Sequence, residues 1–495
     1  MNKVVIAALA LVCASSGVFA QKYKTEIPPA ITTPDSLETR LGTLKFTDGF
    51  PDDATVQKVY DNLDFQRGVQ AFLTALPAAS LAALRRGIRG FGADNQTVLI
   101  FETLADARSL FLTANTESIY VTAWIDLKSG PVVIESPPDT LGLVDDFWFG
   151  YVTDLGNAGP DKGKGGKFLF LPPGYSGPVP EGYYVFKSRT YGNWFITRGF
   201  QVNGDPKPGA ENIKAHLRIY PLAQAGNPPA TTFVNVSGKA FNTIGSTDFS
   251  YFEDVNQVIQ DEPNTSMDPE TLGLLASIGI EHGKPFAPDE RMKKILTEAA
   301  AVGSATARTL TYRSRLKDAY IYPTGAWQSA FIGGSYEFLH DGVRLLDARS
   351  FFFFAATGIT PAMALQIPGA GSAYLFVAAD TNKQPFDGGK TYKLHLPPNI
   401  PAKNFWSLVL YDYQTRSMLQ TDQQFPSVGS QKASIVVNPD TSVDVYFGPE
   451  PPTGKENNWV QTWPGKGWWV ILRLYGPQQA FFDKSWKPGE VEEVR

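Results

Sequence analysis

Cysteine and histidine are the scarcest reactive residues in this chain. Its 495 residues include one cysteine, Cys13, which lies in the apolar part of the N-terminal segment. A chain that loses this segment has no thiol, which excludes disulfides, cysteine nucleophiles and thiolate metal sites. None of the four histidines belongs to a closely spaced ligand pair such as H-E-x-x-H. We therefore expect neither a metal nor a cofactor.

An excess of positive charge and a long apolar run are also missing. There are 44 Lys and Arg against 49 Asp and Glu, a net charge of −5, whereas a nucleic-acid-binding domain usually presents a strongly basic face. After the N-terminal segment, no stretch reaches the roughly 18 apolar residues that indicate a membrane-spanning helix. The sequence has no G-x-S-x-G and no G-x-G-x-x-G behind a strand, which excludes an α/β-hydrolase and a dinucleotide-binding fold.

The first 20 residues have the layout of an export signal. Lys3 gives the positive start, Val4–Ser15 is the apolar centre, and Val18-Phe19-Ala20 fits the small-x-small cleavage rule. The apolar centre is shorter than the roughly 20 residues that span a bilayer. We therefore predict cleavage after Ala20 and a soluble protein in the periplasm or outside the cell.

Turn formers and aromatic residues, by contrast, are abundant. With 45 Gly, 37 Pro and 13% aromatic residues, the composition favours short strands joined by turns over long helical bundles. Residues 119–125 and 468–475 alternate between two faces, as half-buried strands do. The sequence therefore predicts a chain dominated by β-structure.

Helical patterns occur in three places. Residues 56–88 have helical periodicity that Pro77 interrupts. A helical block follows over 249–318, in which Asp289 is the expected N-cap of one helix. The apolar run 345–356 predicts a buried helix.

Several segments of the N-terminal half resemble the DUF1254 family. They are residues 60–65, 112–120, 124–127, 130–133 and 166–175. In that family the central motif usually reads T-x-N-x-D-T-x-Y. Here Glu117 and Ser118 stand where the family has the acid and the threonine.

Several segments of the C-terminal half resemble the DUF1214 family, which commonly follows DUF1254. They are residues 392–394, 397–398, 405–408, 410–412 and 472–477. The resemblance implies a mainly β fold with a helical insert: an N-terminal Ig-like β-sandwich, a small α-helical region and a C-terminal jelly-roll-like β-sandwich. It implies no activity, because both families are defined without one.

A chain of this length predicts about three domains, at roughly 150 residues each. The patterns and the resemblance together predict five regions. These are the signal peptide at 1–20, an N-terminal arm at 21–55, a DUF1254-like β-sandwich domain with N-terminal helices at 56–225, a helical insert at 226–325, and a DUF1214-like jelly-roll domain at 326–495.

The first candidate site lies where a strand begins, at Asn115, Thr116, Glu117, Tyr120 and Trp124. As a functional site, it would use Glu117 and Tyr120 in catalysis, with the other three binding the ligand. As a structural motif, its amide and hydroxyl groups would satisfy backbone groups of a turn. Both interpretations stay open at this point.

The second candidate site lies in the C-terminal half, at Trp406, Tyr411, Asp412, Arg473 and Tyr475. Arg473 and Tyr475 share one strand face, and an arginine buried in so apolar a strand needs a partner. One interpretation is a structural ion pair with Asp412. The other is a ligand pocket in which Arg473 binds a carboxylate or sulfate.

Two functions follow from these candidates. The first is an exported hydrolase or lyase for a small molecule or polymer fragment, with Glu117, Tyr120 and Arg473 as catalytic residues. The alternative is a non-catalytic cell-envelope protein that binds a carbohydrate or lipid-like ligand. A cleft that holds an acid with a raised pKa beside an arginine and a tyrosine would favour the enzyme. Broad sandwich faces and Phe-rich segments leave a homo-oligomer as an open alternative.

Overall fold

The computed structural model describes residues 23–494. The predicted signal peptide, Met1–Ala20, lies outside the described residues. The chain divides into two compact units, one up to Leu63 and one from Asp64 onward, and each is described by itself. Within residues 23–494, no helix is both long and apolar enough to cross a membrane.

The first unit contains a small antiparallel sheet in the order β1-β2-β3. Its strands are β1 (Ser36–Thr39), β2 (Gly42–Thr47) and β3 (Phe50–Pro51). Helix α1 (Asp53–Thr74) begins in this unit, where the Asp52 carboxylate accepts a hydrogen bond from the Thr55 N–H at 2.8 Å. The segment predicted as a plain polar arm therefore contains regular structure, although only Leu44 and Thr55 are buried in it.

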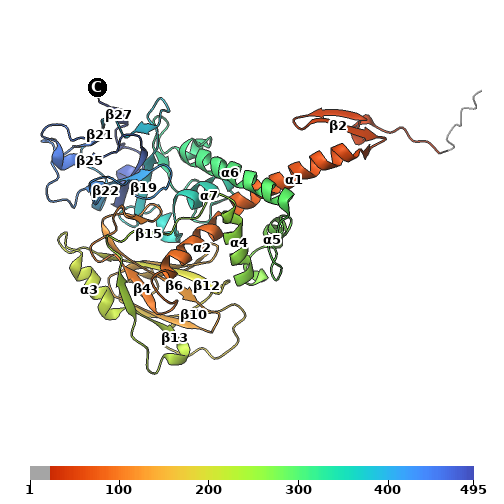
Figure 1. Ribbon diagram of the computed structural model, residues 1–495. Helices are drawn as coiled ribbons and strands as arrows, with labels where there is room; N and C mark the ends of the chain where they lie inside the picture. The colour runs from red at the N-terminus through yellow and green to blue at the C-terminus, as the bar shows by residue number, and fades with distance from the viewer. Residues whose placement is uncertain (1–22, 495) are drawn as a thin grey trace, which may run out of the picture. The chain divides into compact units, whose positions relative to one another are not determined.

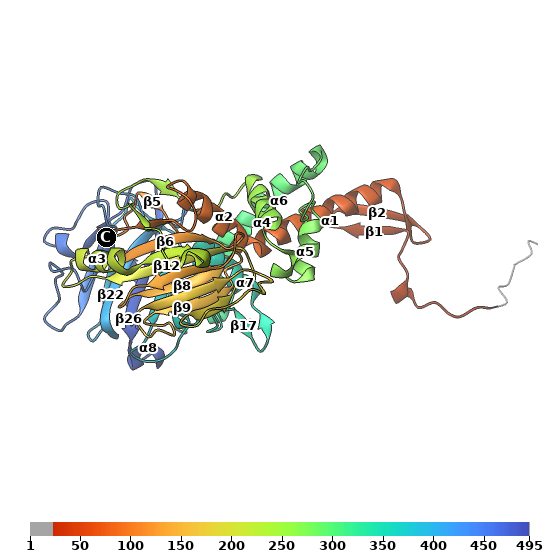
Figure 2. The same ribbon diagram turned by 90° about the horizontal axis from the view of Figure 1, so that it is seen from below.

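The second unit begins with two sheets packed face to face. The six-stranded sheet has the order β14-β4-β6-β12-β8-β9, and Figure 2 shows β6, β12, β8 and β9 side by side. Its strands are β4 (Thr97–Ile100), β6 (Ser118–Asp126), β8 (Leu141–Asp146), β9 (Tyr151–Gly156), β12 (Gly192–Phe200) and β14 (Thr232–Asn235). Strand β14 belongs to this sheet although it follows residue 225.

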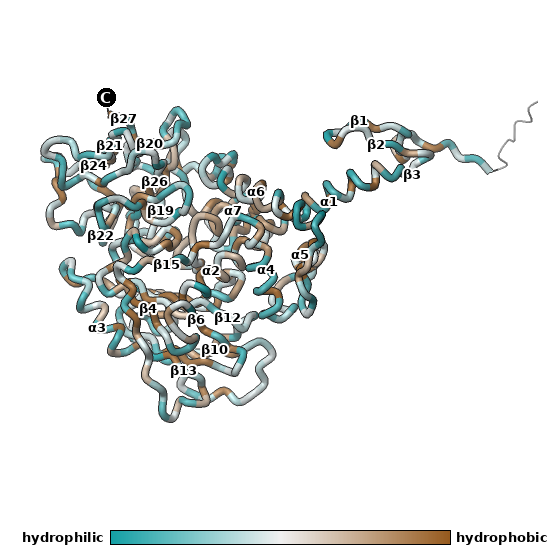
Figure 3. Tube along the Cα trace, viewed as in Figure 1, coloured by the Kyte–Doolittle hydropathy of each residue, from teal (hydrophilic) through white to brown (hydrophobic). Residues whose placement is uncertain are grey.

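The other sheet of this sandwich has the order β11-β10-β7-β13. Its strands are β7 (Val132–Ser136), β10 (Gly166–Leu171), β11 (Tyr184–Lys187) and β13 (Arg218–Pro221). Alternate residues such as Ile119, Val121 and Phe168 fill the space between the sheets, and α3 (Lys207–His216) contributes Ile213. Strands β4, β6 and β10 are accordingly among the most hydrophobic parts of the trace (Figure 3).

The C-terminal part repeats this arrangement with different strands. A larger sheet contains β16 (Gln328–Ser329), β19 (Ser372–Val377), β26 (Gly467–Pro477), β22 (Ala402–Asp412) and β23 (Ser427–Gly429) in that order, with β20 (Phe386–Asp387) paired to β26. A smaller sheet has the order β25 (Trp459–Gln461), β24 (Val443–Gly448), β21 (Tyr392–Leu396) and β27 (Val491–Glu493). Leu408, Trp468 and Leu472 lie in the core that these sheets share.

Helices α2 and α7 lie between the two larger sheets, and further helices of this unit pack beside them (Figure 1). The helices are α2 (Leu76–Arg89), α4 (Ser250–Asp261), α5 (Pro269–Ala276), α6 (Glu290–Tyr312) and α7 (Leu346–Ala355). One core cluster joins them to both sheets, since it includes Trp194 of β12, Phe352 of α7 and Trp469 of β26. The fold is therefore mainly β with helices between two β-layers.

Short elements complete the second unit. They are the pair β5 (Ser109–Leu110) and β15 (Phe241–Asn242), the hairpin β17 (Leu339–His340) and β18 (Val343–Arg344), and α8 (Gln479–Phe482).

The helix predictions are confirmed in detail. Helices α1 and α2 are separated at Ala75, and Pro77 lies in the first turn of α2, where a missing N–H costs nothing. The Asp289 carboxylate caps α6 by accepting a hydrogen bond from the Met292 N–H at 2.7 Å. The run at 345–356 forms the buried helix α7.

Candidate functional site

A cavity of about 100 Å³ lies between the two larger sheets. Strands β6, β8 and β12 supply one wall, strands β19 and β26 the other, and α7 with the segment after it closes the side. Its apolar lining includes Phe111, Leu143, Trp194, Ile196, Phe331, Phe351, Phe352, Met363, Phe376, Trp469 and Ile471. Such a lining favours a compact hydrophobic ligand.

Two strands line this cavity with the same pattern of residues. Trp194, Ile196 and Arg198 are alternate residues of β12, and Trp469, Ile471 and Arg473 are alternate residues of β26. Alternate residues of a strand point to one face, and all six line the cavity. Each sheet therefore contributes a tryptophan, an isoleucine and an arginine in the pattern W-x-I-x-R.

Arg473 is the most deeply buried charge of the cavity, with 3% of its surface exposed. Its Nη2 donates a hydrogen bond to the Thr113 carbonyl at 2.7 Å, whereas its Nη1 has no hydrogen-bond partner. The guanidinium lies 5.9 Å from the ring centre of Tyr374 and 5.7 Å from that of Tyr411. Burial opposes its charge, yet the neighbouring phenols and Glu117 outweigh this and raise the pKa of Arg473.

Arg198 lies on β12 directly opposite Tyr120 of β6. Burial opposes its charge too, but Tyr120, Tyr374 and Tyr475 outweigh this effect and raise the pKa of Arg198. Within residues 23–494, no carboxylate oxygen lies within 4.0 Å of a nitrogen of Arg198 or Arg473. The cavity thus contains two guanidinium groups without an ion-pair partner at contact distance.

Glu117 lies beside the cavity without lining it. It is 8% exposed, and its carboxylate accepts hydrogen bonds from Thr116 Oγ1 at 2.6 Å and from the Thr116 N–H at 3.2 Å. Burial raises the pKa of Glu117, while the Thr116 hydrogen bond and the Arg473 charge oppose the rise. The Thr116 hydroxyl also forms a hydrogen bond with the Ser427 hydroxyl at 2.8 Å, which links this turn to β23.

The contacts of Asn115 fit both interpretations of the first candidate site, the structural turn and the ligand-binding site. Its Oδ1 accepts hydrogen bonds from the backbone N–H groups of Glu117 and Ser118, at 3.0 and 3.2 Å, as a turn requires. Its Nδ2 donates to the Tyr120 hydroxyl at 2.9 Å, and Asn115 and Tyr120 both line the cavity. The turn therefore holds an amide and a phenol at the edge of a possible binding space.

Two tyrosines of the second candidate site lie beside this group. The Tyr411 hydroxyl donates to the Ala114 carbonyl at 2.6 Å, which connects β22 to the first candidate site. The Tyr475 hydroxyl is buried without a partner, and its ring stacks on Phe405 at 4.0 Å. The fold therefore brings Asn115, Glu117 and Tyr120 together with Arg473, Tyr411 and Tyr475, from positions more than 280 residues apart.

The remaining candidates lie elsewhere. Trp124 packs on Phe147 at 4.8 Å in the central core, and Trp406 belongs to the core of the C-terminal sandwich. The expected Asp412–Arg473 pair is wrong, since Asp412 binds Lys466 at 3.2 Å. In the sheet, Asp412 pairs with Trp468, while the partner of Arg473 is Ser407. That register separates the two side chains by five residues along the strand.

Two residues of the cavity, Arg198 and Tyr374, were not among the sequence candidates. A signal for Arg198 exists, because residues 194–198 repeat the W-x-I-x-R pattern of residues 469–473. No comparable signal exists for Tyr374, which reaches the cavity because β19 pairs with β26. Among residues 23–494, no group of three or more His, Cys, Asp or Glu is arranged to hold a metal ion.

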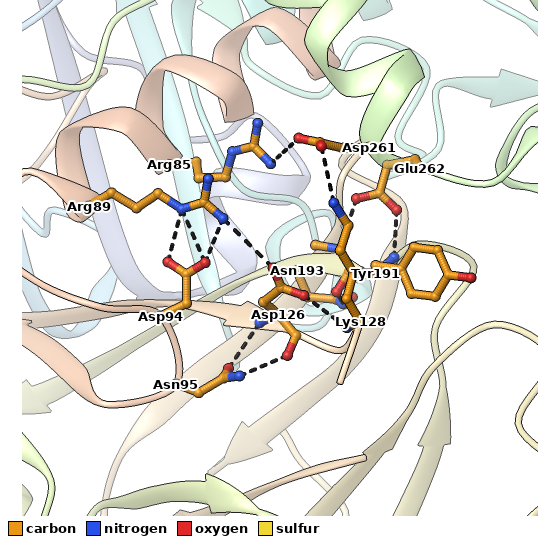
Figure 4. Close-up of polar contacts among 11 residues, drawn as sticks. Arg85, Arg89, Asp94, Asn95, Asp126, Lys128, Tyr191, Asn193, Asp261 and Glu262 are labelled. Atoms are coloured by element: carbon orange, nitrogen blue, oxygen red, sulfur yellow. Dashed lines mark hydrogen bonds and ion pairs between the residues drawn. The ribbon is translucent and has the colours of Figure 1, made fainter. Parts of the chain in front are cut away.

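A second polar cluster lies at the far end of β6, around Arg85, Arg89, Asp126 and Glu262 (Figure 4). Its charges pair internally, with Arg85 to Asp261 at 2.8 Å, Lys128 to Asp261 at 3.0 Å and Arg89 to Asp94 at 2.6 Å. The Glu262 carboxylate accepts hydrogen bonds from the backbone N–H groups of Tyr191 and Gly192, at 2.5 and 2.9 Å. These mutual contacts indicate a structural junction between α2, α4 and β6.

The fold and the cavity define a two-domain β-protein with an arginine-containing space between its domains. Two family models match the chain, both described as proteins of unknown function: DUF1254 at residues 95–221 and DUF1214 at residues 371–479. The chain therefore carries an N-terminal DUF1254 domain and a C-terminal DUF1214 domain. Arg198 lies in the first matched region and Arg473 in the second, so the cavity is built from both.

One solved structure supports this fold. The crystal structure of the VPA0106 protein from Vibrio parahaemolyticus is 18% identical, covers 87% of this chain and 100% of its own, and superimposes with a TM-score of 0.55. A putative uncharacterized protein from Burkholderia cenocepacia is 12% identical, with 88% of this chain and 96% of its own covered and a TM-score of 0.38. No curated protein matches the chain.

Proposed function

We propose that this chain is an exported, non-catalytic protein that binds a small lipid-like or otherwise apolar molecule in the cavity between its two larger sheets. The observation that carries the proposal is the composition of the cavity wall, in which aromatic and aliphatic side chains outnumber the polar ones. The sequence pattern of residues 1–20 supports export.

The size of the cavity limits the ligand to a compact molecule. An apolar cavity of about 150 Å³ in another protein takes up benzene, and this one has about 100 Å³. Benzene is therefore a suitable neutral probe. Its binding to the native state would raise the midpoint of thermal unfolding, because a ligand that binds only the folded protein stabilises it.

Filling the cavity tests the proposal. Ala356 lines it in an extended backbone conformation that accepts a larger side chain. Ala356→Leu should therefore weaken the apparent affinity for benzene at least about tenfold, which is measured as a smaller benzene-induced rise in unfolding temperature. The matched control is Ala301→Leu, which adds the same atoms on the exposed side of α6 and should respond to benzene as the wild type does. An undiminished response of Ala356→Leu would contradict the proposal.

A second function, hydrolysis or elimination on a small molecule, is favoured by one observation. Burial raises the pKa of Glu117, and Arg473 and Tyr120 lie near it. Against it, the carboxylate lies outside the cavity wall and is engaged by Thr116. Turnover of an aryl ester or glycoside by the wild type, lost in Glu117→Gln and kept in the Ala301→Leu control, would favour the enzyme over the binding protein.

A further inference from the structure

We propose that the ligand of this cavity is a monocarboxylate, a compact apolar acid whose carboxylate is bound by Arg473 and Arg198. This inference rests on the proposed binding function and adds the chemical class of the ligand. It assigns the two arginines as the groups that select that class.

The charge of the cavity wall is the first argument. Arg198 and Arg473 are among its lining residues, and none of the lining residues is Asp or Glu. The polar groups that accompany them are the neutral side chains of Thr113, Asn115, Tyr120, Thr357 and Tyr374. The wall therefore carries two positive charges and no negative one.

The hydrogen bonding of Arg473 is the second argument. A buried charge is costly unless it is paired and hydrogen-bonded, yet the Nη1 of this 3%-exposed guanidinium has no acceptor. Its Nη2 is already committed to the Thr113 carbonyl. A carboxylate oxygen entering the cavity would supply the missing acceptor and the missing charge.

The acid beside the cavity wall, Glu117, favours a ligand with one negative charge. Glu117 lies outside the cavity wall, and its charge raises the pKa values of Arg473 and Tyr475. It neutralises part of the positive charge, so a monoanion is matched better than a dianionic phosphate or phosphonate, which Glu117 would repel.

The repeated W-x-I-x-R pattern orients the ligand. On each strand the arginine and the tryptophan are four residues apart, which is roughly 13 Å along a strand. A carboxylate bound at the arginine end would place the apolar body over Ile196 and Ile471, toward Trp194 and Trp469. Small aromatic or branched aliphatic acids have this shape.

Isothermal titration with three probes of similar size tests the inference on the full chain. Benzoate should bind the wild type at least about tenfold more tightly than benzamide, its neutral counterpart, or phenylphosphonate, its dianionic one. Arg473→Met should reduce benzoate affinity at least about tenfold, to the level of benzamide, while benzene binding persists. Arg416→Met is the matched control, because Arg416 is equally buried but donates to the Phe354 and Gln414 carbonyls outside the cavity.

The outcomes separate this inference from the proposed function. If benzene binds but benzoate binds no better than benzamide, or phenylphosphonate binds best, the carboxylate inference is wrong and the apolar cavity stands. If none of the probes binds, both are wrong. Should Arg473→Met not fold, Arg198→Met and Arg473→Lys take its place, and wild-type affinity for benzoate in both would overturn the inference.

Discussion

Phe353→Ala is expected to lower the free energy of unfolding by about 4 kcal/mol, the range typical of a deleted buried phenylalanine. Phe353 is 5% exposed and stacks on Phe149 of the N-terminal domain, with ring centres 5.1 Å apart and planes at 9°. It also packs edge-on against Phe352 and Phe338. Its loss would remove these aromatic contacts between α7 and the N-terminal domain.

The reason for so large an effect is the position of α7 between the sandwiches. Its consecutive phenylalanines contact different parts of the molecule: Phe351 stacks on Phe376 of β19, Phe352 contacts Phe331, and Phe353 contacts Phe149. The second half of α7, residues 351–355, is apolar on all sides and is buried, as such a helical segment must be to be stable. This helix therefore holds the two domains, and the cavity between them, in place.

Denaturant unfolding checks this prediction. Leu346→Ala is the matched control, since Leu346 lies in the same helix but is 56% exposed and should cost less than about 0.5 kcal/mol. A loss below about 1 kcal/mol for Phe353→Ala would show that α7 does not connect the domains as described.

Glu262→Gln is expected to remove a pH dependence of about 3 kcal/mol from the free energy of unfolding. Burial raises the pKa of Glu262 from 4.5 to about 7, despite its two backbone hydrogen bonds. A carboxyl group with a raised folded-state pKa favours folding when protonated, and this advantage is lost as the pH rises from about 4.5 through 7. Each pKa unit corresponds to about 1.4 kcal/mol. Gln is neutral at every pH, but its amide nitrogen cannot accept the second backbone hydrogen bond, so the two proteins are compared across pH.

The free energy of unfolding of Glu262→Gln relative to the wild type should therefore rise by about 3 kcal/mol between pH 4.5 and pH 8. Glu253→Gln changes an exposed residue of α4, the helix that ends just before Glu262, and should show no such pH dependence. If the Glu262→Gln difference is equal at both values of pH, Glu262 does not titrate with a raised pKa.

Local features of this fold could be predicted from the sequence. The strand at 118–126, the interruption before Pro77, the Asp289 cap and the buried helix at 345–356 each depend on residues close together in the chain, so periodicity and capping rules reveal them. The cluster at Asn115 and Glu117 was visible for the same reason.

Long-range features could not be predicted in the same way. To predict the partner of Arg473, one needs the register between β22 and β26, which composition does not specify. A shift of a few residues in that register changes the partner of every residue in both strands. The space between the domains depends on how two sheets and α7 pack, so neither Tyr374 nor the absence of acids from the wall could be read from the sequence. The repeated W-x-I-x-R pattern was readable, and it marks the two strands that face each other.

The central claim is that the cavity between the DUF1254 and DUF1214 domains binds a small apolar acid, and a crystal structure of the protein grown with benzoate tests it most directly. The account predicts density for the ring among Trp194, Ile471 and Trp469, with the carboxylate at Arg473 Nη1. Benzoate bound only elsewhere, or a cavity closed by its own side chains with no benzoate in it, would contradict the account.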